Sequence, residues 1–191
     1  MKFYLTIFAF ITILPIVNAQ CDVKPFTVTV ITADGTPLQD IIVKIQKDQT
    51  SQPLTVVTDQ NGKANIGTDR CVTLTFEPSS PVEYLAGISI LDLVRIQRHI
   101  LGLQHFKHNA NIVAADANND GRVTAGDLSE LRKLILGITS QLPSPNYRFF
   151  TEYELNAPGP IFINDIIELD GLNIIDDNIN VYYVKTGDIL E

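Results

Sequence analysis

The sequence contains no tryptophan, one methionine and two cysteines, and its acidic residues outnumber its basic ones by 22 to 14. The resulting formal net charge of −8 argues against nucleic acid as a partner, because phosphate binding requires a surface rich in Lys and Arg. No CxxC motif and no Cys/His arrangement indicates a catalytic cysteine. The hydrophobic content of 45% is nevertheless sufficient for a packed core and argues against global disorder.

The first residues resemble a targeting segment. Met1 and Lys2 give a short positive start, an apolar run follows, and Val17–Ala19 supplies small residues for cleavage. This pattern predicts a secretory signal peptide over residues 1–19 and therefore a secreted or cell-surface protein. The alternative is a membrane anchor, but the apolar run is short for a spanning helix, and we expect no membrane span in the mature chain.

The two cysteines, Cys21 and Cys71, both fall in the predicted mature chain. Disulfides persist in exported proteins, and exported chains with two cysteines usually pair them. A Cys21–Cys71 disulfide is therefore the preferred prediction, and two buried free thiols are the alternative.

Residues 20–80 alternate like short β-strands separated by turns. "FTVTVIT", "IIVKIQ", "PLTVVT" and "CVTLTFEP" are rich in β-branched residues, and Asn61-Gly62 is a strong hairpin signal. A small β-sandwich is the expected fold. The stretches "ITADGTPLQDIIVKI" and "TVVTDQNGKANI" resemble carboxypeptidase regulatory-like (transthyretin-like) modules, which implies a structural or spacer role without catalytic residues.

Residues 81–143 contain an internal duplication with a different periodicity. "DLVRIQRHILGL" (92–103) and "DLSELRKLILGI" (127–138) align at a spacing of 35 residues, and each has apolar residues three and four positions apart. This spacing predicts two amphipathic helices in a repeated unit.

A stretch of hard oxygen donors, "DANNDGRVTAGD", precedes the second helix and has the register of a twelve-residue calcium loop. Gly121 stands at position 6, where a sharp turn is needed, and the last position carries Asp instead of the usual Glu. The alternative is a polar turn with an N-capping aspartate. The predicted Ca²⁺ ligands, with Arg122 contributing only its backbone carbonyl, are Asp116, Asn118, Asp120, Arg122, Thr124 and Asp127.

The first repeat departs from this pattern, because Pro81 and Leu85 occupy ligand positions and their side chains carry no oxygen. A second, degenerate metal site remains one hypothesis, and a loop held by packing with Asp92 as a helix cap is the other. The residues that could form the degenerate site are Glu83, Gly87, Ser89 and Asp92.

A calcium loop that runs into a helix and is repeated after 35 residues resembles a dockerin domain. Residues 84–143 are similar to the dockerin-like repeats of large exported Bacteroidetes proteins, in which a β-sandwich precedes the repeats and a β-rich tail follows. The resemblance implies calcium binding and a protein partner of the cohesin type. Dockerin recognition residues are commonly hydroxyl-bearing pairs at loop positions 10 and 11, whereas this chain has Ile90-Leu91 and Ala125-Gly126 there. We expect Ile90 and Leu91 to pack inside the protein, against the flanking sheets.

The overall expectation is an α+β chain of several modules: a β-sandwich (20–80), dockerin-like helical repeats (81–143) and a β-rich segment (144–191) that either forms its own sheet or joins the sandwich. Its expected function is non-catalytic, calcium-dependent docking or structural support outside the cell, in the context of polysaccharide handling. One alternative is a small exported glycan hydrolase that uses loop carboxylates. Another is a fragment of a larger adhesin.

Overall fold

The computed structural model describes residues 24–47, 52–67, 71–81, 83–155, 163, 165–170 and 177–190. The predicted signal peptide (1–19) and Cys21 lie outside the described residues. Cys71 is disulfide-bonded, and its pairing with Cys21 stays a prediction. None of the helices in the described part of the chain has the length and apolar character that crossing a membrane would need.

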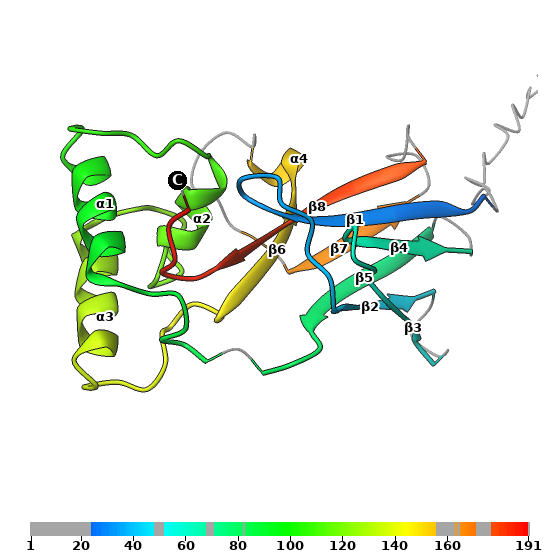
Figure 1. Cartoon of the computed structure of the whole chain (residues 1–191), viewed down its shortest axis with the longest axis horizontal. Helices are drawn as coiled ribbons and strands as arrows, with labels where there is room; N and C mark the ends of the chain where they lie inside the picture. Colours follow the sequence, from blue (N-terminus) through cyan, green and yellow to red (C-terminus); the bar gives the residue numbers. More distant parts are fainter. Residues whose placement is uncertain are drawn as a thin grey trace, which may run out of the picture.

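Eight strands and four helices follow one another along the described chain. In order they are β1 (Phe26–Thr32), β2 (Ile41–Gln46), β3 (Leu54–Val57), β4 (Lys63–Ile66), β5 (Cys71–Pro78), α1 (Ile90–Ile100), α2 (Ala110–Ala115), α3 (Ala125–Ile135), β6 (Tyr147–Thr151), α4 (Glu152–Leu155), β7 (Ile166–Asp170) and β8 (Asn178–Lys185). The helices α1–α3 are gathered at one end of the molecule and the strands at the other (Figure 1).

The strands form two four-stranded sheets, ordered β4-β1-β8-β6 and β3-β2-β5-β7. Strands from the second half of the chain therefore enter both sheets, and β8 lies between β1, to which it is parallel, and β6, to which it is antiparallel. This arrangement decides what the sequence left open: the described strands after residue 144 join the two sheets and do not form a sheet of their own. The strands of residues 20–80 supply only part of each sheet.

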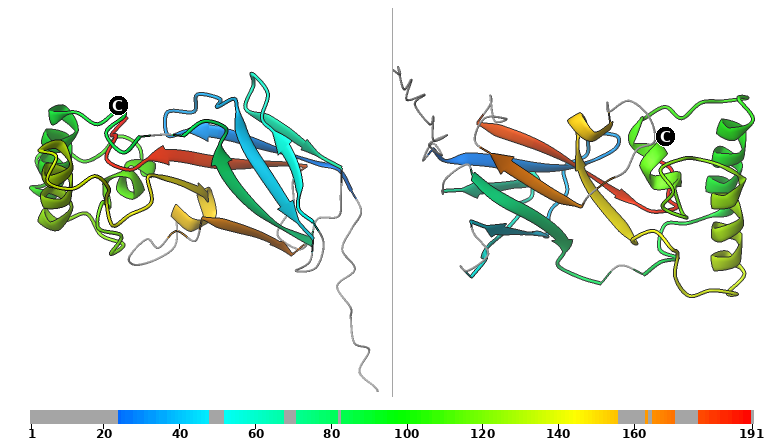
Figure 2. Two further views of the ribbon diagram at one scale, coloured as in Figure 1. Left: turned by 90° about the horizontal axis from the view of Figure 1, so that it is seen from below. Right: turned by 180° about the vertical axis from the view of Figure 1, so that it is seen from behind.

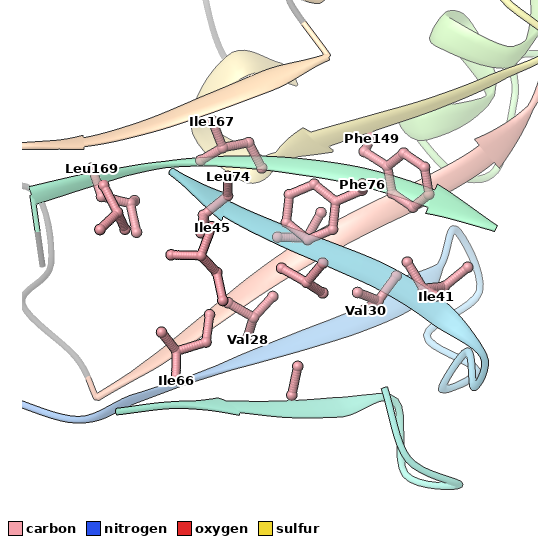
Figure 3. Close-up of a cluster of buried hydrophobic side chains, with 14 of the residues drawn as sticks. Val28, Val30, Ile41, Ile45, Ile66, Leu74, Phe76, Phe149, Ile167 and Leu169 are labelled. Atoms are coloured by element: carbon pink, nitrogen blue, oxygen red, sulfur yellow. The ribbon is translucent and has the colours of Figure 1, made fainter. Parts of the chain in front are cut away.

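Alternating burial explains why the two sheets face each other. In β1, β2 and β5, every second side chain is buried and the intervening ones are half-buried, which is the two-residue period of a strand with one face on a core. Figure 3 shows the inward side chains of both sheets meeting between them, among them Val28, Leu74 and Ile167. Phe76 of one sheet stacks on Phe149 of the other, with 5.3 Å between ring centroids.

A second hydrophobic cluster joins the helices to the end of the sheets. Leu93 and Ile96 of α1 and Leu131 and Leu134 of α3 are buried in it together with Phe150 of β6. Helices α1 and α3 pack against each other, and the chain leaves them at opposite ends of the pair (Figure 1). Both views in Figure 2 show β8 running from the sheets towards these helices.

The duplication predicted from the sequence is confirmed in the bounds of α1 and α3, which begin and end 35 residues apart. Their first turns are also alike: the backbone N–H groups of Ser89 and Thr124 donate to the carboxylates three residues later. Both helices end before a glycine with positive φ, Gly102 at 65° and Gly137 at 68°.

Two expectations about local structure are wrong, and one helix was not predicted. Asn61-Gly62 does not join a hairpin, because β3 and β4 belong to different sheets and the turn carries the chain between them. The segment expected to be β-rich (144–191) is interrupted, because its first strand ends at Thr151 and the short helix α4 begins at Glu152. Helix α2 was not predicted, because its six residues are too few to show a helical period. It is buried and contacts β8.

The turn at Gly62, which carries the chain from one sheet to the other, gives a stability prediction. Gly62 has φ 68°, and a Cβ there would lie 2.4 Å from the carbonyl oxygen of Val30. We expect Gly62→Ala to lower the free energy of unfolding by more than the roughly 1–2 kcal/mol that a left-handed alanine costs by itself. Gly35→Ala is the matched control, because Gly35 also has positive φ but open space at its Cβ position. Equal losses in urea denaturation of the two variants would contradict the prediction.

Candidate functional site

The predicted calcium loop connects α2 to α3. Asp116 is the C-cap residue of α2, and Asp127 is the third residue of α3. Two loop residues have positive φ, Asn119 at 61° and Gly121 at 77°, and these reverse the chain so that the loop folds back on itself. The sequence-based choice of Gly121 as the turning residue agrees with this backbone, whereas Asn119 was not singled out.

Asp116 is buried, with 5% of its surface exposed, and its carboxylate lies inside the loop. The Oδ1 atom accepts a hydrogen bond from Asp120 N at 3.0 Å, and Oδ2 accepts one from Gly121 N at 2.9 Å. Burial raises the pKa of Asp116, the two backbone hydrogen bonds oppose that change, and the negative charges of Asp127 and Asp120 raise the pKa further. The loop thus holds several negative charges close together.

Asp127 is fully buried at the start of α3. Its Oδ2 accepts the Thr124 backbone N–H at 2.7 Å, and its Oδ1 accepts the Asn118 N–H at 3.1 Å. Within the described residues, neither Asp116 nor Asp127 has a salt bridge to a basic side chain. In the described part of the chain, these two buried carboxylates are therefore compensated by backbone amides and, for Asp127, by the Thr124 hydroxyl at 3.4 Å, although a buried charge without a basic partner is costly.

The remaining predicted ligands lie nearer the surface. Asn118 Oδ1 accepts Asp120 N, and Asn118 Nδ2 donates to Asp120 Oδ2 at 2.9 Å. The other Asp120 oxygen accepts the N–H of Arg122, whose side chain is exposed, as expected for a residue that would offer only its carbonyl. Thr124 caps α3 by accepting Gly126 N with its hydroxyl.

The side chains of this loop suit calcium by their chemistry. They offer carboxylate, amide and hydroxyl oxygens, which are the donors that Ca²⁺ prefers, and the buried negative charge calls for a cation. In the described part of the chain, no three His, Cys, Asp or Glu side chains are gathered as in a formed metal site. The Asp116 and Asp127 carboxylates accept backbone N–H groups instead. The donor set fits the ion in type and charge.

Arg148 of β6 ties the loop to the sheets and was missed by the sequence reasoning. Its buried guanidinium donates to both oxygens of Asp165 at 2.9 and 3.0 Å and to Asn119 Oδ1 at 3.0 Å. A third contact, to the carbonyl oxygen of Ile163, uses Nη2. Near it, Ser144 N donates to Ala117 O at the start of the loop. An arginine inside a hydrophobic strand was the only available signal for this residue.

The first repeat is arranged differently. Asp92 is 2% exposed and occupies the position of Asp127, but it forms an ion pair with Arg95, with 3.2 Å between Nη1 and Oδ1. Its Oδ2 accepts both the N–H and the hydroxyl of Ser89. Glu83 and Gly87, the other residues of the hypothetical second metal site, are exposed in the turn before α1.

The expectation that Ile90 and Leu91 are buried against the sheets is wrong. Ile90 is 73% exposed and Leu91 is 55% exposed, and Val94, one turn further along α1, is also exposed. The spacing of these residues places them on one face of the helix. The equivalent residues in the second repeat, Ala125 and Gly126, are exposed as well but much smaller. The two repeats therefore present different chemistry at matched positions.

Two further groups of ionisable side chains, around His99 and around Glu152, do not form a catalytic arrangement within the described residues. His99 lies in α1 and stacks on Phe106 with 4.0 Å between ring centroids. A cavity of about 260 Å³ between Ala33, His108 and Tyr182 contains a single carboxylate, that of Glu152. Glu154 instead accepts the backbone N–H of Thr151. A paired acid and base is thus not formed at this cavity.

Comparison with protein families supports a dockerin domain in the helical region: residues 87–136 match the family model of the dockerin type I domain. The match spans α1, α2, the loop and α3, and it does not extend to the strands. Dockerin domains are generally non-catalytic modules for protein–protein docking, and they bind calcium. The comparison with curated proteins found no match to this chain.

The Arg148 contacts predict a large stability effect. Arg148→Met would leave Asn119 Oδ1 without its Arg148 donor and the Asp165 carboxylate with the Phe149 N–H at 3.4 Å, so we expect the free energy of unfolding to fall by about 2 kcal/mol. Lys133→Met is the control, because it removes an exposed ion pair with Glu130 and should cost less than about 1 kcal/mol. Chemical denaturation followed by circular dichroism measures both, and a similar small loss for each variant would refute the role of Arg148.

Proposed function

We propose that residues 81–143 are a dockerin-type docking module, that the loop from Asp116 to Asp127 binds one Ca²⁺, and that the exposed apolar face of α1 contributes to the docking surface. The observation that carries the calcium assignment is the burial of Asp116 and Asp127 without a basic partner in the described residues. Asn118, Asp120, Thr124 and the backbone carbonyl of Arg122 complete the proposed ligand set.

Calcium would supply the positive charge that the loop needs. The ion would be held by the Asp116, Asp120 and Asp127 carboxylates, and the repulsion among them would become attraction to the ion. Because Asp116 ends α2 and Asp127 begins α3, a bound ion would fix the angle between these helices. Calcium binding would therefore add to the folding free energy of the helical region, and this role is structural, not catalytic.

The proposed docking surface is apolar where dockerin recognition positions are commonly polar. Ile90, Leu91 and Val94 form an exposed apolar face, and large apolar side chains are also exposed after both helices, at Leu103 and Ile138. Such exposure is typical of interaction surfaces. The family match supports a folded protein partner of the cohesin type, one whose contact surface is apolar opposite Ile90 and Leu91.

The remaining parts of the chain complete the proposal. The signal peptide over residues 1–19 would export the protein, and the two sheets would serve as a carboxypeptidase regulatory-like β-sandwich that carries the docking module. The whole chain would be non-catalytic and would act in extracellular polysaccharide handling. The sequence pattern supports the signal peptide and the carrier module. The match to the dockerin type I domain supports a non-catalytic role, as does the cavity at Glu152, whose described lining holds no second carboxylate.

Calcium titration tests the loop. The mature protein should bind one Ca²⁺, and its Tm should rise with calcium and fall with EDTA. Asp116→Asn and Asp127→Asn should each weaken binding by at least about tenfold, because each removes a carboxylate charge from the ligand set. Glu168→Gln, on an exposed strand position, is the control and should leave binding unchanged. If millimolar calcium gives neither heat nor a Tm shift in calorimetry, the calcium assignment fails.

Binding to a type I cohesin module tests the docking face. Leu91→Glu should weaken the complex by about thirtyfold or more, because a charge would enter an apolar contact. Val57→Glu is the matched control, since Val57 is similarly exposed but lies on β3 in the sheets. Both variants should keep the Tm of the parent chain. Unchanged affinity of the Leu91 variant in titration calorimetry would show that this face of α1 does not dock.

A further inference from the structure

Asp92 and Asp127, in the first turns of α1 and α3, each accept two backbone hydrogen bonds, and the donor of the second bond differs between the repeats. In each case Oδ2 accepts the N–H of the N-cap residue at 2.7 Å, from Ser89 in the first repeat and Thr124 in the second. In the second repeat, Asp127 Oδ1 accepts the N–H of Asn118, within its own loop. In the first repeat, Asp92 Oδ1 accepts the N–H of Ile189, 97 residues further along the chain.

Ile189 belongs to a segment, Gly187–Leu190, that follows Thr186 and enters the helical region; we call it the C-terminal segment. Gly187 N donates to Ala114 O of α2 at 2.7 Å, and Asn111 Nδ2 donates to Leu190 O at 2.6 Å. The Ile189 side chain is 2% exposed and packs in the cluster formed by the helices. The C-terminal segment is thus packed within the helical region and does not lie on its surface.

Arg95 fixes Ile189 at its second backbone group. Its Nη1 donates to Ile189 O at 2.9 Å and to Asp92 Oδ1 at 3.2 Å. The carboxylate of Asp92 and the guanidinium of Arg95 therefore bind the N–H and the C=O of one residue. Such two-point contacts fix orientation as well as position, and the charged partners strengthen both hydrogen bonds.

A second pair of charges lies beside this contact. Lys185, the last residue of β8, is buried, and its ammonium donates to the carbonyl oxygens of Tyr84 at 2.7 Å and Thr186 at 3.2 Å. Asp188 approaches the turn before α1 so closely that a Cβ at Gly87 would lie 2.4 Å from its Oδ2. Burial raises the pKa of Asp188, the charge of Asp92 adds to that rise, and the charges of Lys185 and Arg95 oppose it. Two carboxylates and two cations are therefore gathered here.

We propose that the C-terminal segment takes the place of the missing part of the loop in the first repeat. Arg95 and Lys185 provide the positive charge there. This repeat is therefore held by the chain itself and binds no calcium. The site on the helical region is a recognition site for the backbone of Gly187–Leu190. Only the contrast with a calcium-bound second repeat rests on the proposed function; the contacts of the C-terminal segment do not.

This arrangement makes the helical region depend on strand β8. The stretch that matches the dockerin type I model ends at residue 136, yet Ile189 and Lys185 contact the first repeat from the sheet side. The first helix should therefore be ordered whenever the C-terminal segment is in place, with or without calcium. The second helix should respond to calcium.

Native-state hydrogen exchange of the full chain and of a chain ending at Thr186 tests the proposal in calcium and in EDTA. Loss of the C-terminal segment should lower the protection of α1 amides by at least about tenfold in both solutions, since several hydrogen bonds and a buried side chain are lost. In the full chain, EDTA should lower protection in α3 more than in α1. Unchanged α1 protection after truncation would overturn the proposal.

Because the shortened chain can fail to fold, Asp92→Asn and Arg95→Met in the full chain provide a second measurement, with Asp127→Asn as the matched control. The two first-repeat variants should lower Tm equally in calcium and in EDTA and leave one bound Ca²⁺. A fall from two bound ions to one in Asp92→Asn would refute the proposal. If instead Asp127→Asn leaves calcium binding intact, the calcium assignment of the second loop fails, while the result for the C-terminal segment in EDTA still stands.

Discussion

Two buried carboxylates at equivalent helix starts, Asp92 and Asp127, are the constraint on which the helical region depends. Each caps its helix through the N-cap backbone N–H, and each brings a negative charge into an interior that tolerates it only with compensation. The chain meets this need in two ways. Asp92 has Arg95 and the backbone of Ile189, whereas Asp127 has backbone amides and the Thr124 hydroxyl but no basic partner among the described residues. This difference is the basis for proposing calcium in the second repeat.

The sheets and the helices form one connected structure. β8 lies within a sheet, and the residues directly after it enter the helical cluster. Arg148 of the neighbouring strand β6 donates a hydrogen bond to Asn119 in the loop of the second repeat. Each repeat is therefore attached to the sheets by a charged side chain with several hydrogen bonds, Lys185 for the first repeat and Arg148 for the second. A change in the loop would alter the contacts of β6. This connectivity separates the chain from a docking module that is joined to its carrier by a flexible linker.

Local features were predictable where neighbouring residues supply the whole signal. The alternation in β1, β2 and β5 and the apolar spacing around Leu93 and Leu131 were read correctly, because burial on one face imposes its period on the sequence. The turn at Asn61-Gly62 was placed correctly but joined the wrong strands, since a turn signal does not state which sheet follows. Ile90 and Leu91 were misread for a related reason: hydrophobicity alone does not state whether a side chain lies on the buried or the exposed face of its helix.

The sequence by itself determined the duplication and the loop with its oxygen donors, because each of these is a short-range pattern within one segment. The N-cap residues, Ser89 and Thr124, lie three residues before the aspartates that the sequence offered as caps. The tertiary structure alone decided that strands from both halves of the chain share two sheets and that Arg148 reaches Asn119. It also decided that the backbone N–H of Ile189 donates to Asp92 in the first repeat. These contacts join residues far apart in the chain, and they form because buried charges and backbone groups must find partners wherever the fold brings them.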